Sequence, residues 1–223
     1  MLRWLGNALT SSVGRKLVMG LTGLLLIGFL VEHLAGNLKL FEDADGTSFN
    51  AYKEWLDSFG PLLVVAEIGL FLLFGVHIAL ALKLSLENRE ARASRYVIRA
   101  SRGRSNAASL SMLITGSLIL VYLVKHVVFD FRFVGVYSDA PAQTVKETLA
   151  KPLNGFFYIA AMGILGLHLA HGFRSAFQSL GVSHPKLDPL LDKLGLTVAV
   201  VLAVGFAAFP IYYLFLWKGA PQG

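Results

Sequence analysis

Five long apolar stretches constrain this sequence more than any other feature does. They run approximately over residues 16–38, 61–86, 105–129, 152–177 and 190–217. A helix that crosses the hydrocarbon core of a membrane needs about 20 predominantly apolar residues, and each stretch is long enough. We therefore predict an all-α integral membrane protein with five transmembrane helices.

The composition agrees with this prediction. Hydrophobic residues make up 55% of the 223 residues and charged residues only 15%, whereas soluble domains carry about 25% charged residues. No cysteine is present, which excludes disulfides, thiolate-held iron–sulfur clusters and cysteine-ligated zinc. A metal must therefore be held by histidine or carboxylate, or arrive within a cofactor. We find no repeat and no second domain, so residues 1–223 are interpreted as a single membrane domain.

The basic residues indicate the direction of the spans. The net charge is +6, but these residues gather in the loops between the spans, so we expect membrane lipid and no nucleic acid as a partner. The loop after the second span carries six arginines within 89–104, while the loop after the first span is acidic. Lysine and arginine accumulate on the cytoplasmic side. We therefore predict a multi-pass protein of the cytoplasmic (inner) membrane, with the N-terminus cytoplasmic and the C-terminus outside.

Histidines occur in four of the five spans. Ionisable groups in hydrocarbon are costly and normally functional, so one in each of four successive spans indicates a cofactor role. His33 and His126 lie toward the C-terminal ends of the first and third spans, whereas His77 and His168 lie past the midpoints of the second and fourth. In the predicted orientation, the first pair lies near the outer surface and the second pair lies nearer the cytoplasm.

These depths predict two binding positions across the core of a bundle. If the first four helices form an up-down-up-down bundle, helices one and three face each other diagonally, as do helices two and four. Two neutral imidazoles on one haem iron leave no open site for oxygen. The pattern therefore predicts two b-type haems that serve electron transfer. His168 and His171 lie three residues apart in the fourth span, and periodicity alone leaves the choice between them open.

Four stretches of the sequence resemble a known family. They are residues 33–37 (HLAGN), 49–53 (FNAYK), 59–69 (FGPLLVVAEIG) and 168–186, which begins HLAHGFRSAFQSLG. They look like the cytochrome b membrane subunit of succinate dehydrogenase and fumarate reductase, in its single-chain form with five helices and two haems. The similarity extends over nearly the whole chain.

The resemblance implies ligands and partners. It implies that His33 and His126 bind the iron of a distal haem, and that His77 and His168 bind the iron of a proximal haem. The family subunit anchors a flavoprotein subunit and an iron–sulfur subunit on the cytoplasmic face. It passes electrons between them and membrane quinone (menaquinone or ubiquinone), as the subunit of succinate:quinone oxidoreductase that does not bind the dicarboxylate.

The resemblance also favours one of the two histidines of the fourth span. In the family, the ligand in the fourth helix is followed four residues later by a glycine. Gly172 stands at that distance from His168, whereas Ser175 stands there for His171. His168 is therefore the expected ligand.

Further site residues follow from the resemblance and from their chemistry. Arginine binds carboxylates through its planar fork. Four basic residues are therefore candidates for contacts with haem propionates: Arg15, Lys16, Arg104 and Arg174. The alternative is the positive-inside bias itself, which needs no ligand. Ser11 is a candidate for a quinone site. Glu54 is the candidate for proton transfer to quinone; the alternative is a solvated acid on an amphipathic surface helix over residues 50–59.

Two rival functions stay open. One is a quinone-reactive dihaem cytochrome b of a hydrogenase or formate dehydrogenase, although that type places its histidines differently and lacks the motif that begins at His168. The other, from a different class, is a proton-coupled membrane transporter whose histidines relay protons. The transporter predicts no haem.

Overall fold

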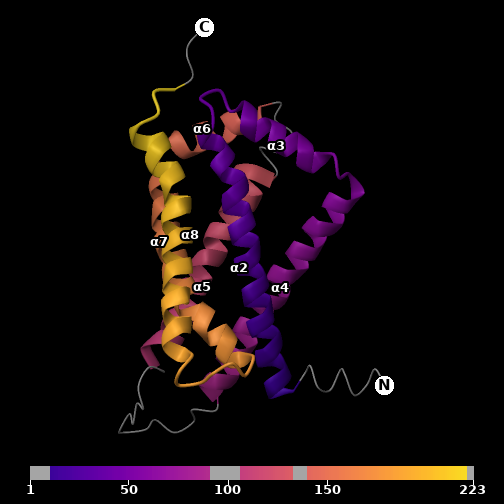
Figure 1. Cartoon of the computed structure of the whole chain (residues 1–223), viewed down its shortest axis with the longest axis vertical. Coiled ribbons are helices and arrows are strands. Elements are labelled where there is room, and N and C mark those ends of the chain that lie inside the picture. Colours follow the sequence, from indigo (N-terminus) through magenta and orange to yellow (C-terminus); the bar gives the residue numbers. More distant parts are fainter. Residues whose placement is uncertain (1–10, 91–105, 133–139, 220–223) are drawn as a thin grey trace.

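The computed structural model describes residues 11–90, 106–132 and 140–219. The regular elements in these ranges are all helical (Figure 1). The long helices are α2 (Ser12–Asn37), α4 (Pro61–Glu90), α5 (Asn106–Val124), α7 (Pro152–Ser179) and α8 (Asp188–Phe215). The shorter elements are η1 (Leu38–Phe41), α3 (Thr47–Asp57), the π-helix η2 (Lys125–Arg132) and α6 (Pro141–Ala150).

Five segments are long and apolar enough to cross a membrane, which confirms the predicted helical class and the number of candidate spans. They are Ser12–Phe41, Pro61–Glu87, Ser111–Phe131, Pro152–Ser179 and Asp188–Phe215. Large apolar side chains cover their outer faces; Phe71 of α4 is 78% exposed and Leu153 of α7 is 85% exposed. Such a surface suits contact with lipid tails rather than with water.

The helix ends differ from the predicted ones for local reasons. The Ser11 side chain accepts a hydrogen bond from the Gly14 backbone N–H at 3.0 Å, so α2 begins at Ser12 rather than near residue 16. Pro210 lies within α8, which continues to Phe215. The third span changes from α-helix to π-helix at Lys125, a change that apolar periodicity does not reveal.

The long helices contact one another around a central space. α2 packs against α4 and α7, α5 packs mainly against α7, and α8 lies along α7 in the most extensive helix–helix contact. Small residues allow this close approach. A Cβ atom at Gly20 of α2 would lie 2.9 Å from the Ala176 carbonyl oxygen of α7, and one at Gly166 of α7 would lie 2.9 Å from the Ala203 Cβ of α8. In Figure 1, α4 diverges from α2 toward the end of the molecule where α3 lies.

The short elements close one end of the molecule. α3 and α6 lie at this end (Figure 1), where the buried Lys146 of α6 donates a hydrogen bond to the Ala44 carbonyl oxygen at 2.9 Å. Before α3, the Asp43 carboxylate accepts backbone hydrogen bonds from Gly46 and Ser48, both at 2.7 Å. Hydrogen bonds from Ser48 are the main cause that holds the pKa of Asp43 below its ordinary value. These contacts fix the loop that follows the histidine-bearing end of α2.

Candidate functional site

A cavity of about 1300 Å³ lies between α2, α4, α5 and α7. Most of its lining is aliphatic or aromatic, and His77 of α4 and His168 of α7 both line it. Pockets for drug-sized ligands usually measure about 300–1,000 Å³, so this cavity has room for a larger ligand. It combines a mostly apolar wall with a few polar groups, as cofactor sites do.

The hydrogen bond to His77 defines which of its nitrogens is free. Nδ1 of His77 lies 3.1 Å from the Thr22 hydroxyl of α2, and that hydroxyl donates to the Met19 carbonyl oxygen at 3.0 Å. A hydroxyl has a single hydrogen, so when Thr22 gives it to Met19 the hydroxyl accepts from the imidazole. In this arrangement His77 carries its proton on Nδ1, and Nε2 has a free lone pair.

His168 has the same arrangement on the other side of the cavity. Its Nδ1 lies 3.0 Å from the Thr115 hydroxyl of α5, which donates to the Ser111 carbonyl oxygen at 2.7 Å. With the Thr115 hydrogen on Ser111, this arrangement again places the imidazole proton on Nδ1 and the lone pair on Nε2. This is the tautomer in which a histidine binds a metal through Nε2 while its N–H is held by an outer group.

A glycine follows the threonine in both cases. A Cβ atom on Gly23 would lie 3.4 Å from Cε1 of His77, and one on Gly116 would lie 3.4 Å from Cε1 of His168. The pairs Thr22-Gly23 and Thr115-Gly116 thus form equivalent seats, each for an imidazole from a neighbouring helix. The repeated Thr-Gly pair in the first and third spans is the signal from which sequence reasoning could have found these supports.

His33 of the first span and His126 of the third lie side by side. The ring centroids of His33 (α2) and His126 (η2) are 6.0 Å apart, with an angle of 86° between the ring planes. A metal–imidazole nitrogen bond is about 2 Å long, so two imidazoles on opposite sides of one metal ion have ring centroids about 6 Å apart. Leu30 and Leu123, each three residues before one of these histidines, line the cavity. The cavity therefore reaches to within one helical turn of this pair.

A polar chain holds His126. Its Nδ1 lies 3.1 Å from the Tyr158 hydroxyl of α7, and Tyr158 donates to the Asp130 carboxylate at 2.7 Å. Lys125 donates to both oxygens of Asp130, at 2.8 and 2.6 Å. When the Tyr158 hydroxyl donates its hydrogen to Asp130, it accepts a hydrogen bond from the imidazole. In this arrangement His126 also carries its proton on Nδ1. Sequence reasoning missed Asp130 and Tyr158.

His33 is held differently. Its ring stacks on Phe29 with centroids 5.3 Å apart, and it lies 5.7 Å from the Phe206 ring of α8. Asn37 donates to the His33 carbonyl oxygen at 2.7 Å, and its Nδ2 lies 3.5 Å from both ring nitrogens. Aromatic packing rather than a defined hydroxyl partner therefore orients this ring.

The two histidines of α7 occupy different environments. His168 is partly buried and rests on Thr115, as described above. His171 is exposed, and its Nδ1 lies 2.9 Å from the Leu167 carbonyl oxygen of its own helix. His171 also lines the cavity, but its Nδ1 contacts a backbone carbonyl of its own helix, whereas Nδ1 of His168 contacts a hydroxyl of the facing helix α5.

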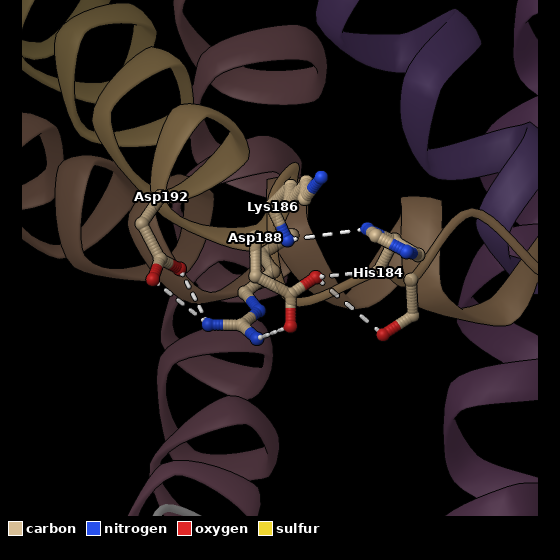
Figure 2. A network of polar contacts seen from close by, with 6 residues as sticks. His184, Lys186, Asp188 and Asp192 are labelled. Carbon is tan, nitrogen blue, oxygen red and sulfur yellow. Dashed lines mark hydrogen bonds and ion pairs between the residues drawn. The ribbon is translucent and has the colours of Figure 1, made fainter.

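The candidate propionate residues divide into three groups. Arg15 forms an ion pair with Glu87 at 2.9 Å, and Lys16 is exposed. Arg174 lines the cavity and is bound at 2.8 Å by both oxygens of Asp192 and by Asp188 (Figure 2). Arg104 lies outside the described residues. A carboxylate ligand at Arg15 or Arg174 would therefore compete with carboxylates of the chain itself.

Asp188, the first residue of α8, also binds the turn that precedes this helix. In Figure 2, Asp188 also faces His184, whose backbone N–H donates to it at 3.2 Å. The Lys186 N–H donates to Nδ1 of His184 at 3.2 Å. His184 is exposed and serves this turn, so it has a local structural role.

The candidate quinone residues lie away from the cavity lining. Ser11 is the cap of α2, and Glu54 is exposed on α3. On the same helix, the Tyr52 hydroxyl donates to Glu32 at 3.2 Å. Burial, and then the nearby Glu32 carboxylate, raises the pKa of Tyr52 above its ordinary value. The structure therefore brings Tyr52, and not Glu54, to the residue that precedes His33.

The donor set limits which metal could bind. In the described ranges, no group of three or more histidine, aspartate or glutamate side chains could hold a metal ion. Paired histidines instead fit a metal that brings its other ligands with it, as haem iron does. No protein-family model, curated protein or solved structure matches this chain.

The Thr115 support makes a prediction about stability. We expect Thr115→Val to lower the free energy of unfolding by about 1–3 kcal/mol, because the N–H of His168 loses its acceptor in a buried place. Thr115→Ser keeps the hydroxyl and should retain most of that stability. Unfolding of the detergent-solubilised protein with sodium dodecyl sulfate, followed by tryptophan fluorescence, measures the difference.

Thr197→Val on the exposed face of α8 is the matched control, and it should change the unfolding free energy little. Equal stability of the Thr115→Val and Thr115→Ser proteins would contradict the assigned hydrogen bond.

Proposed function

We propose that this chain is the membrane-anchoring dihaem cytochrome b subunit of a succinate:quinone oxidoreductase, either a succinate dehydrogenase or a fumarate reductase. In this role it transfers electrons between an iron–sulfur subunit and membrane quinone. A haem bound by two imidazoles supplies one-electron transfer at an iron that has no open position for oxygen. The chain's own residues would bind and orient the two haem groups and exclude water from them.

The observation that supports metal binding best is which ring nitrogen of each histidine contacts a hydroxyl group. Nδ1 of His77, His168 and His126 each lies 3.0–3.1 Å from a hydroxyl that also has a carbonyl or carboxylate acceptor. This is the arrangement in which the imidazole carries its proton on Nδ1. Three histidines with the same fixed tautomer, on three different helices, are expected of metal ligands. Histidines that relay protons in a transporter need both nitrogens to exchange protons, so this fixed state argues against the rival class.

The environment supports haem as the metal group. His77 and His168 line a cavity that is mostly apolar, which suits a flat hydrophobic macrocycle. His33 and His126 have the ring spacing of two ligands to one ion and are surrounded by aromatic rings. The apolar walls would exclude water and favour electron transfer over side reactions.

The resemblance supports the partner half of the proposal. Its longest motif, residues 168–186, contributes several residues to the cavity wall: His168, Arg174, Ser175, Gln178 and Ser179. The stretch that resembles the family is therefore also a stretch that borders the candidate site. We propose that a flavoprotein subunit and an iron–sulfur subunit bind on the cytoplasmic face, beside the N-terminus and the basic loop 89–104.

We further propose the orientation that the loop charges predict, with the N-terminus cytoplasmic and the C-terminus outside. His77 and His168 then hold the haem nearer the iron–sulfur partner, and His33 and His126 hold the haem nearer the outer surface. The quinone, menaquinone or ubiquinone, binds within reach of this electron path. Ser11, Glu54 and the propionate contacts of Arg15, Lys16, Arg104 and Arg174 stay predictions.

Single replacements test the four ligands. We expect His33→Ala, His77→Ala, His126→Ala and His168→Ala each to lower the haem content by about one haem per chain, because one axial ligand is lost. His171→Ala and His184→Ala are matched controls and should keep the full content. The reduced haemochrome spectrum gives the haem content, and circular dichroism shows that the helices persist. Full haem content in His168→Ala, with loss in His171→Ala, would reverse the assignment.

Purification from the native membrane tests the partners. An affinity-tagged chain, extracted in mild detergent, should bring with it a flavin-containing subunit and an iron–sulfur subunit, and the complex should reduce a dye with succinate. Copurification of a nickel- or molybdenum-containing subunit would instead support the hydrogenase or formate dehydrogenase alternative. A haem-free chain that purifies alone would contradict both and favour a transporter.

A further inference from the structure

Asp130 stands apart from the other charged residues of the spans. Its side chain is only 9% exposed, yet it lies in a segment that is long and apolar enough to cross a membrane. Buried charges of this kind need partners. Asp130 has two, the Lys125 ammonium and the Tyr158 hydroxyl, and the hydroxyl in turn contacts His126.

The π-helix makes this constellation possible. Lys125 and Asp130 are five residues apart, and in an α-helix side chains with that spacing point about 140° away from each other. In a π-helix the backbone hydrogen bonds join residues five apart, so side chains with that spacing lie on neighbouring parts of one face and the two can meet. π-Helical turns are rare and occur often at functional sites. The π-helical segment thus places the Asp130 carboxylate near Nδ1 of His126, with the Tyr158 hydroxyl between them.

The support of His126 differs in charge from the other supports. At His77 and His168 the accepting threonine donates onward to a neutral backbone carbonyl. At His126 the accepting tyrosine donates onward to a carboxylate. A hydroxyl polarised by a carboxylate is a stronger acceptor, so the imidazole of His126 becomes more electron-rich. Outer partners of this kind orient a ligand and raise its basicity.

We propose that Asp130 is a positioning residue that acts through Tyr158 on His126, fixing its tautomer and lowering the reduction potential of the metal group that His126 binds. This inference rests on the proposed function for its metal group, while the tautomer itself concerns the chain alone. Lys125 donates to both oxygens of the carboxylate and so holds it in place. The relay therefore distinguishes the two haem sites chemically.

Redox titration of the haem bands tests the relay. Asp130→Asn and Tyr158→Phe should each raise the midpoint potential of one haem and leave the other unchanged. Thr115→Val is the matched control, and it should shift only the other haem. If Asp130 acts through Tyr158, the double variant shifts the potential by less than the sum of the single shifts. Additive shifts, or no shift of either haem, would overturn the relay.

A measurement without haem separates this inference from the proposed function. In the haem-free chain, ¹⁵N NMR of labelled histidine should show His126 as the neutral Nδ1–H tautomer, with its signal identified by its loss in His126→Ala. Tyr158→Phe should produce a mixture of tautomers. A mixture in the unaltered chain would overturn the relay, whereas a fixed tautomer in a chain that never binds haem would leave the relay standing and defeat the proposed function.

Discussion

The candidate site depends on the fact that a hydroxyl group has one hydrogen. Thr22, Thr115 and Tyr158 each give that hydrogen to an oxygen, and each therefore accepts from an imidazole. The consequence is chemical as well as structural, because the accepting hydroxyl decides which ring nitrogen keeps its lone pair. Inside hydrocarbon this choice is firm, since an imidazole N–H without an acceptor is costly there.

Each histidine of the cavity and the threonine that binds it come from different helices. α4 and α7 contribute His77 and His168, while α2 and α5 contribute the Thr-Gly pairs that receive them. Each glycine permits the ring to approach, and each preceding threonine binds it. The support of one histidine by another helix means that ligand geometry and helix packing depend on each other. A change in packing between α2 and α4 would therefore also reorient His77.

The fold was largely predictable and the details of the site were not. Hydrocarbon imposes long apolar segments, so all five candidate spans follow from hydropathy. The histidines within them can be recognised as ionisable residues among apolar ones. The π-helix does not, because it leaves the apolar character of 105–129 unchanged. Nor do ion pairs such as Arg15–Glu87, whose partners lie on different helices. The predicted propionate roles of Arg15 and Arg174 rest on residue type, because spacing does not locate their carboxylate partners.

The family resemblance and the geometry support the proposal in different ways. The motifs point to the soluble partners and to quinone, about which the positions of the helices say little. The hydrogen bonds point to metal ligation, and they would do so for any two-histidine metal group. Both kinds of support involve His168, which begins the longest motif and whose Nδ1 contacts the Thr115 hydroxyl.

Electron paramagnetic resonance of the oxidised protein, purified from its native membrane, tests the central claim most directly. If each histidine pair clamps one haem, the spectrum contains two distinct low-spin ferric signals, each equivalent to about one per chain, as two imidazole ligands require. A high-spin signal from a haem with an open position would contradict the paired ligation. The absence of any haem signal would contradict the account as a whole.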